Sequence, residues 1–192
     1  MSKIAIFGGS FDPVHKSHIQ LVKFALKSCD FKKVIFVIAH TPPHKNKQYA
    51  STDDRVAMLK IATKGLSQIE ISLYEVLKKK VVYSYQTLDY FQSLYPKDEI
   101  YMIIGLDSLL ELPTWKNIDY LASHYKFMVV KRPCINIKKD IKYLDRCIVA
   151  QNETEDISST GVRQMIKEGF KKFEMLLDKN VYNYIVERGL YK

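Results

Sequence analysis

Short, continuous apolar runs recur along this chain, and stretches with the apolar spacing of helices separate them. The runs that predict strands are residues 3–7, 34–39, 100–104 and 127–130, with weaker ones at 69–73 and 146–149. The stretches that predict helices are roughly 17–28, 51–65, 85–95 and 116–124. Strands that are apolar on both faces and alternate with helices form parallel sheets buried between layers of helices. The sequence therefore predicts an α/β fold, a doubly wound parallel sheet with helices on both faces.

The length of the chain indicates the number of domains. With 192 residues, of which 47% are hydrophobic, the chain is long enough to bury one full sheet and its covering helices. We expect a single domain over residues 1–192, with a tail of two or three short helices from about 158 to 192. The run at 69–73 alternates between apolar and polar residues, which places it nearer an edge of the sheet.

The sequence carries no targeting or disulfide pattern. No run reaches the ~18 to 20 apolar residues of a membrane helix, and the N-terminus lacks the long apolar stretch of a signal peptide. We therefore expect a cytoplasmic protein without a membrane partner. Its three cysteines lie far apart and form no Cys-x-x-Cys pair, so neither a disulfide framework nor a zinc site is indicated.

The formal net charge of +9 is compatible with polyanionic partners such as nucleotides or RNA. The basic residues are 25 Lys and 5 Arg, however, and lysine is mostly a solvated surface residue. Base-reading proteins favour arginine. A solvated basic surface is therefore the simpler interpretation, and only Arg132 and Arg163 lie where a functional role is indicated, after a strand and in the first turn of a helix.

A candidate phosphate site follows the first predicted strand. Gly8 and Gly9 come where the strand turns into a helix, and such glycines let backbone N–H groups approach an anion. His15 and His18 are three residues apart and share one face of the first helical turn. Imidazoles at a helix N-terminus tend to be neutral and can donate to phosphate oxygens. A tight structural turn and a surface histidine pair are the alternative interpretations.

A second candidate phosphate site lies near the C-terminus, in Ser158-Ser159-Thr160-Gly161-Val162-Arg163. One hydroxyl is explained as a helix N-cap, but three hydroxyls followed by an arginine are not. A cation is slightly unfavourable in the first turn of a helix unless an anion is held there. The pattern therefore predicts a second group of phosphate ligands.

Loops follow the predicted strands at 8–13, 40–45, 105–108 and 131–133. Ligands of open parallel sheets bind beyond the carboxyl ends of the strands, so these loops are expected to surround one cleft.

The motifs together resemble those of a known superfamily. Gly-Ser-Phe-Asp-Pro-x-His-x-x-His at 9–18 and Ile-Ser-Ser-Thr-x-x-Arg at 157–163 look like the paired signatures of the nucleotidyltransferases with a Rossmann-like fold. Within that superfamily, the chain is similar to the bacterial nicotinate-nucleotide adenylyltransferases. The residues that carry this similarity are Pro42-Pro43-His44-Lys45, Gly105–Leu109, Leu112–Trp115 and Gly189-Leu190-Tyr191.

The resemblance implies a reaction in NAD biosynthesis. The phosphate of nicotinate mononucleotide attacks the α-phosphorus of ATP, giving nicotinate adenine dinucleotide and pyrophosphate. By similarity, His15, His18 and Arg163 are catalytic, and Mg²⁺ is bound through the ATP phosphates without a protein metal site. The residues expected at ATP are Gly8, Gly9, Ser10, Phe11, Arg132, Ser158, Ser159 and Thr160.

The resemblance also implies a mononucleotide site, with Trp115 as the platform for the pyridine ring and backbone N–H groups near Tyr85 and Lys116 for the nicotinate carboxylate. Asp107 is expected at a ribose hydroxyl. The full set is His44, Lys45, Ser84, Tyr85, Asp107, Trp115 and Lys116. The alternatives are a core tryptophan, a helix N-cap at Asp107 and plain loop charges at His44 and Lys45.

Two segments depart from the family pattern. Ser17 stands where the family usually has Gly, and a Ser-Tyr-Thr segment is replaced here by Val82-Tyr83-Ser84.

The competing functions are another adenylyl- or cytidylyltransferase, such as a phosphopantetheine adenylyltransferase, and a non-catalytic nucleotide- or RNA-binding module. We expect no nucleic acid partner, and a monomer or small homo-oligomer.

Overall fold

A computed structural model describes residues 1–40, 48–130, 141–150 and 157–192, and these contain a six-stranded sheet in the order β3-β2-β1-β4-β5-β6. Every neighbouring pair is parallel. The strands are β1 Lys3–Gly9, β2 Phe31–Ile38, β3 Ile69–Ser72, β4 Glu99–Gly105, β5 Lys126–Val130 and β6 Cys147–Ala150. The predicted parallel sheet is confirmed, and β3 lies at an edge as its alternating pattern indicated.

The α-helices are α1 Lys16–Ser28, α2 Thr52–Ala62, α3 Tyr74–Lys78, α4 Ser84–Leu94, α5 Leu106–Glu111, α6 Ile118–His124, α7 Ser159–Lys167 and α8 Lys179–Glu187. Short 3₁₀ helices cover Leu112–Thr114, Leu144–Arg146 and Lys171–Leu176. The four predicted helices are present, and the tail after residue 158 contains short helices as expected. None of the described helices is both long and apolar enough to span a bilayer.

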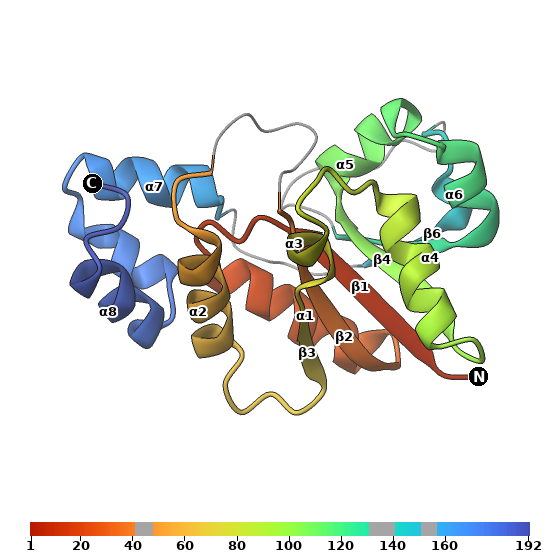
Figure 1. Ribbon diagram of the computed structural model, residues 1–192, viewed down its shortest axis with the longest axis horizontal. Coiled ribbons are helices and arrows are strands. Elements are labelled where there is room, and N and C mark those ends of the chain that lie inside the picture. The colour runs from red at the N-terminus through yellow and green to blue at the C-terminus, as the bar shows by residue number, and fades with distance from the viewer. Residues whose placement is uncertain (41–47, 131–140, 151–156) are drawn as a thin grey trace.

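Alternate residues of the strands enter two separate cores. Ala5 and Phe36 face a core that includes α1, α2, α7 and α8. Ile6 and Ile35 face a second core with α4, α5 and α6. Side chains alternate between the two faces of a strand, so a run that is apolar throughout supplies both cores at once. Figure 1 shows the sheet between these two groups of helices, which is the doubly wound arrangement expected.

The sequence missed two helices and the start of a strand. The five-residue α3 and six-residue α5 are too short to show a helical period. Strand β2 begins at Phe31 rather than Val34, because Lys32 and Lys33 interrupt the apolar run. The chain enters β2 through Asp30, whose φ of 55° turns the backbone into the strand.

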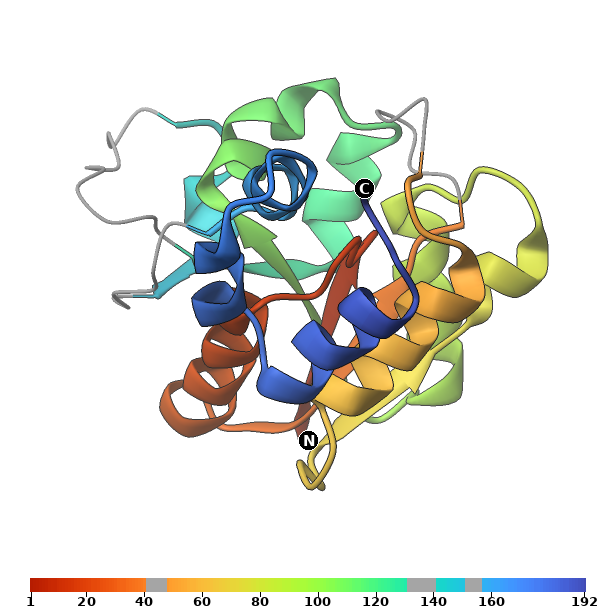
Figure 2. The same cartoon turned by 90° about the vertical axis from the view of Figure 1, so that its left-hand side faces the viewer.

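The C-terminal helices pack against the N-terminal half of the molecule. Helix α8 contacts α2, and Figure 2 shows it lying alongside that helix. Val181 and Ile185 of α8 are buried in the same core as Met58 and Leu59 of α2. The end of the chain is therefore held beside elements that are more than 100 residues away in sequence.

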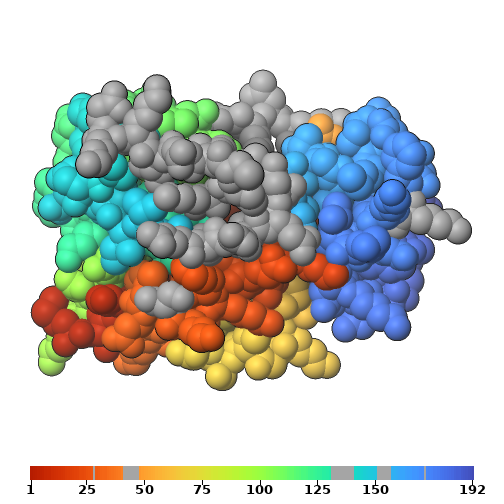
Figure 3. Space-filling view, turned by 180° about the vertical axis from the view of Figure 1, so that it is seen from behind, coloured from red at the N-terminus to blue at the C-terminus, as the bar shows by residue number. Residues whose placement is uncertain are grey.

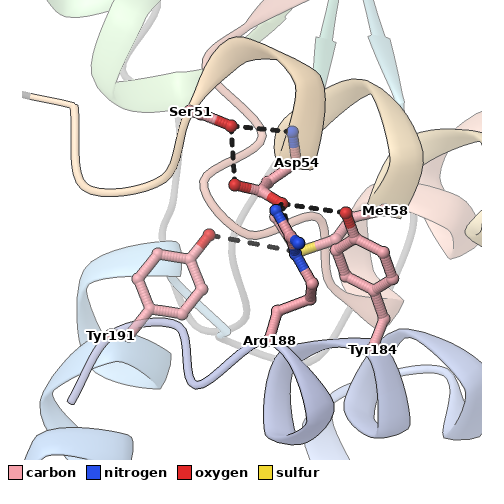
Figure 4. A network of polar contacts seen from close by, with 6 residues as sticks. All are labelled: Ser51, Asp54, Met58, Tyr184, Arg188 and Tyr191. Carbon is pink, nitrogen blue, oxygen red and sulfur yellow. Dashed lines mark hydrogen bonds and ion pairs between the residues drawn. The ribbon is translucent and has the colours of Figure 1, made fainter.

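Asp54 on α2 is the polar centre of this contact (Figure 4). One carboxylate oxygen accepts hydrogen bonds from the Tyr184 hydroxyl at 2.8 Å and from Arg188 Nε at 3.2 Å. The other accepts from the Ser51 hydroxyl at 2.6 Å. The hydrogen bond from Ser51, followed by those from Tyr184 and Arg188, lowers the pKa of Asp54 against the opposing effect of burial.

We expect Asp54→Asn to lower the free energy of unfolding by about 1–2 kcal/mol at neutral pH, because hydrogen bonds to an ionised group are replaced by weaker ones. A carboxyl group with a lowered pKa stabilises the fold above its unfolded pKa of ~4 and loses this contribution as pH falls below that value. Urea titrations should therefore show the two proteins converging below pH ~4. Asp53→Asn is the control, because Asp53 is exposed on the same helix. A constant difference down to pH ~2 would contradict the assignment.

Candidate active site

The two candidate phosphate sites predicted from sequence meet in the structure. The Ser159 hydroxyl donates to the Pro13 carbonyl at 2.9 Å, and Arg163 Nη1 donates to the Asp12 carbonyl at 2.7 Å. Figure 3 shows the blue C-terminal segment adjoining the red-orange N-terminal one. The loop after β1 and the first turn of α7 therefore form one surface.

Helix α7 starts as its sequence predicted. Ser158 is the N-cap, and its hydroxyl accepts from the Gly161 N–H at 3.1 Å. The Thr160 hydroxyl accepts from Arg163 Nη2 at 3.0 Å. The guanidinium also lies over the Tyr49 ring, 4.2 Å from its centroid. Arg163 is thus held at the positive end of its own helix, an arrangement that favours a bound anion.

Asp12, which the sequence motif contains but which we did not predict as a site residue, orders the first loop. Its carboxylate accepts from the backbone N–H groups of Tyr49 and Ala50 at 2.8 and 3.1 Å and from the Tyr191 hydroxyl at 2.7 Å. Burial, together with the charge of Asp12, raises the pKa of Tyr191, so this hydroxyl stays protonated and donates. The last residues of the chain therefore help to hold the first loop.

Arg55 of α2 is a buried residue that sequence reasoning missed. It is 0% exposed, and Nη1 donates to the carbonyls of Ser10 and Ala39, each at 2.9 Å. Burial lowers its pKa, with an opposing effect of the Asp12 charge, but an arginine remains protonated at physiological pH. The guanidinium thereby joins the loops that follow β1 and β2. Nothing in the sequence around it separates this arginine from a solvated one.

The backbone at Gly9 is shaped by the ring of Phe11. A Cβ at Gly9 would come within 2.9 Å of that ring, so this position requires glycine unless the ring shifts. Phe11 itself has a φ of 48°, in the left-handed region, and its buried ring makes edge contacts with Phe36 and His18. Packing of one aromatic side chain therefore fixes the strand-to-helix turn predicted at Gly8–Phe11.

His15 and His18 lie together at the start of α1. His15 is the N-cap residue, and the two rings stack with centroids 3.6 Å apart. The backbone N–H of His15 donates to His18 Nδ1 at 3.2 Å, which requires a lone pair on Nδ1 and leaves the His18 proton on Nε2. Burial lowers the pKa of His15 to about 4, so its imidazole is neutral at physiological pH.

A cavity of about 520 Å³ lies at the carboxyl ends of β1 and β4, where the strand order reverses. It is lined by residues 8–10 and by the end of β4 at Gly105. Polar and aromatic groups at its walls are Glu75, Tyr83, Ser84, Ser108, Thr114, Trp115 and Lys116. A crevice at this position is where open α/β sheets bind ligands.

Trp115 both lines this cavity and packs on the core of α4, α5 and α6, so the structure is compatible with a ring platform and with a core tryptophan. Ser84 also lines the cavity, and Lys116 does so as an exposed residue. The Tyr85 side chain instead packs against Tyr83 and Tyr120 with ring centroids 6.3 Å apart in each case.

The remaining predicted positions divide into three groups. Asp107 is exposed in the first turn of α5, and Gly105 occupies the N-cap, so the interpretation of Asp107 as an N-cap is wrong. The unusual Ser17 and Val82 are both buried, and Val82 lines the cavity. His44, Lys45 and Arg132 lie outside the described residues.

A second cavity of about 580 Å³ lies between α1, α2 and the start of α8. His15 reaches it, together with Lys16, Lys23 and Lys64. Among the described residues, no group of three His, Cys, Asp or Glu side chains could hold a metal ion.

Comparisons with known proteins show the family and the fold of the chain. The model of the cytidylyltransferase-like family matches residues 6–165. A probable nicotinate-nucleotide adenylyltransferase of Endomicrobium trichonymphae is 64% identical over the full length of both chains, and one of Clostridium tetani is 36% identical over the same extent. The solved structure of the Plasmodium falciparum nicotinic acid mononucleotide adenylyltransferase with NaAD has a TM-score of 0.85 at 20% identity. It covers 100% of this chain and 98% of its own, and it shows the same fold.

We expect Arg55→Met to lower the free energy of unfolding by about 3 kcal/mol, because the buried carbonyls of Ser10 and Ala39 lose a charged donor. Chemical denaturation followed by circular dichroism measures the change. Lys60→Met, at an exposed position of the same helix, should change stability by less than ~0.5 kcal/mol. Equal stability of the two variants would show that Arg55 does not hold the loops.

Proposed function

Because the chain belongs to the cytidylyltransferase-like family and, within it, to the nicotinate-nucleotide adenylyltransferases, we propose that it transfers the adenylyl group of ATP to nicotinate mononucleotide. The products are nicotinate adenine dinucleotide and pyrophosphate, and the reaction belongs to NAD biosynthesis. The observation that carries this proposal is the contact of Arg163 and Ser159 with the loop at Asp12 and Pro13, directly before the histidine pair.

The nucleophile of this reaction is a phosphate that is already anionic, so the protein needs no strong general base. Catalysis depends on positioning and on stabilising the charge that develops on phosphoryl oxygens. We assign the Nε2–H of His18 as a donor to the α-phosphoryl group, with neutral His15 beside it. Ser158, Ser159, Thr160 and Arg163 are assigned to the departing pyrophosphate, and Gly8, Gly9, Ser10 and Phe11 to backbone contacts with ATP.

The cavity at the carboxyl ends of β1 and β4 is assigned to the mononucleotide. Trp115 at its wall offers a ring face for the pyridine, and Ser84 with the first turn of α4 offers donors for its carboxylate. Lys116 lines this cavity, while Tyr85, Asp107, His44, Lys45 and Arg132 remain predictions from the resemblance. The acid on the pyridine ring therefore lies at a positive helix end.

Mg²⁺ is proposed as part of the substrate, bound to ATP phosphates and water. The described residues fit this arrangement, since the carboxylate of Asp12 is already engaged by three donors. The proposal treats residues 1–192 as one nucleotidyltransferase domain, because late helices complete the site of the first loop. The cytoplasmic location and the monomeric or small oligomeric state expected from the sequence belong to the proposal as well.

Product analysis tests the proposed function. The purified protein is incubated with MgATP and one acceptor phosphate at a time: nicotinate mononucleotide, nicotinamide mononucleotide or phosphopantetheine. We expect pyrophosphate and nicotinate adenine dinucleotide with the first acceptor. Turnover of phosphopantetheine alone would assign the chain to another branch, and no turnover with any acceptor would contradict an enzymatic role.

His18→Ala is expected to reduce kcat by about 10²–10³-fold, because a donor to developing phosphoryl charge is lost. Its cost in stability should be about 1 kcal/mol, since the ring also accepts from the His15 N–H and covers Phe11. Steady-state kinetics and thermal denaturation measure the two effects. His124→Ala, at an exposed position on α6, is the control and should retain full activity. A retained kcat in His18→Ala would exclude the assigned role.

Trp115→Ala should raise KM for nicotinate mononucleotide about tenfold to a hundredfold, because stacking on an aromatic ring contributes about 1–3 kcal/mol. KM for ATP should change little, and Trp115→Phe should lie between the two proteins. The measurement is KM for each substrate with the other one saturating. Equal increases in both KM values would indicate that the indole only supports the core.

A further inference from the structure

A partly buried carboxyl group lies at the wall of the mononucleotide cavity and has no role in the mechanism above. Glu75 belongs to α3, and its side chain lines the cavity together with Ser84, Trp115 and Lys116. One carboxyl oxygen accepts from the Thr87 hydroxyl at 2.7 Å. Thr87 is 3% exposed, so this hydrogen bond holds Glu75 from inside the protein.

Thr87 ties Glu75 to the start of α4. Helix α4 begins at Ser84, with Tyr83 as N-cap, and the Thr87 N–H donates to the Tyr83 carbonyl at 3.2 Å. The same helical turn is proposed to receive the pyridine carboxylate. A carboxyl group of the protein and a carboxylate of the substrate therefore share one helix end, where two negative charges repel each other.

The charge of Glu75 is variable near neutral pH. Burial raises its pKa to about 7, against the opposing effect of the Thr87 hydrogen bond. A raised pKa means that the neutral form dominates below pH ~7 and the ionised form above it. Both forms are thus accessible under ordinary conditions.

Other titratable groups near Glu75 are engaged elsewhere or lie across the cavity. On α3, the Lys78 ammonium lies 5.2 Å from the centroid of the Tyr74 ring. On α4, Asp89 accepts from the hydroxyls of Tyr120 and Tyr125. Across the cavity the groups are the exposed Tyr83 phenol and the exposed Lys116 ammonium.

We propose that Glu75 is a specificity-determining residue that selects between acid and amide substituents on the pyridine ring. This inference rests on the proposed function of the cavity. The neutral carboxyl can donate a hydrogen bond to the nicotinate carboxylate, as a charge-assisted contact. The ionised carboxyl repels that group but accepts from the NH₂ of a nicotinamide. The protonation of one side chain therefore decides which mononucleotide the cavity favours.

The test compares two mononucleotides in one enzyme. Nicotinate and nicotinamide mononucleotides carry the same phosphate and attack the same phosphorus of ATP. A group that titrates away from the ring substituent therefore changes both kcat/KM values equally, and its effect is absent from their ratio. Binding is measured separately by fluorescence of Trp115, the single tryptophan of the chain, which lines the cavity. Both readouts are taken from pH 6 to pH 9.

In the wild type, the kcat/KM for nicotinate mononucleotide divided by that for nicotinamide mononucleotide should fall at least tenfold between pH 6 and pH 9. The fall cannot exceed about a hundredfold. Above pH ~7, an affinity that depends on protonated Glu75 changes at most tenfold per pH unit, and the measured range extends two units above that pH. In Glu75→Gln, which stays neutral, the ratio should be independent of pH. Glu70→Gln, at an exposed position on β3, is the matched control and should keep the wild-type dependence.

Thr87→Val provides a second variant that leaves Glu75 in place. Loss of the hydroxyl removes the contact that lowers the pKa of Glu75, so the midpoint of the pH dependence should move to higher pH. A merely structural role of Glu75 would not produce this shift. If Glu75→Gln fails to fold, the Thr87→Val midpoint decides the question.

Three results would overturn the proposal. They are a pH-independent ratio in the wild type, an unchanged pH dependence in Glu75→Gln, and an unshifted midpoint in Thr87→Val. Failure of the proposed function is distinguishable, because the wild type would then turn over neither mononucleotide at any pH. Trp115 fluorescence would in that case still report whether Glu75 changes the binding preference.

Discussion

The loop that follows β1 depends on hydrogen bonds to three segments that are distant from it in the sequence. Arg55 donates to the Ser10 carbonyl from helix α2, and Arg163 donates to the Asp12 carbonyl from the late helix α7. The Asp12 carboxylate in turn accepts from the Tyr191 hydroxyl near the C-terminus. Without these contacts the loop would have many conformations and would lose much entropy on binding a ligand. Preorganisation of this loop therefore supports the proposed phosphate site.

The groups assigned to the ligands are mainly helix N-termini and neutral side-chain donors. Arg163 supplies a fixed positive charge. The N-termini of α1, α4 and α7 each carry residues assigned to a ligand. His15 is kept neutral by burial, and His18 receives the His15 N–H at Nδ1 and thus presents Nε2–H. Such donors suit a reaction in which negative charge moves among phosphoryl oxygens. Glu75, which Thr87 links to the start of α4, is proposed to determine the choice of substrate through its protonation.

Sequence patterns predicted the elements whose signal is long enough to read. The continuous runs of β1, β2, β4 and β5 indicated a parallel sheet, and the amphipathic stretches indicated α1, α2, α4 and α6. Helices α3 and α5 span less than two turns, so they carry no readable period. Helix α3 is the element that places Glu75 at the cavity. The sequence therefore failed to predict the helix that carries Glu75, because that helix is too short to show a helical period.

The sequence alone determined the type of fold and the two phosphate motifs, because both depend on residues that are neighbours in the chain. Apolar runs specify buried strands, and hydroxyl groups before a helix specify its N-cap and indicate a helix end that could bind an anion. Only the tertiary structure decided that Arg55 is buried, that Tyr191 reaches Asp12 and that Glu75 faces the cavity of Trp115. These facts depend on contacts between distant segments. Burial and charge pairing, which change what an ionisable side chain does, arise only when those segments pack together.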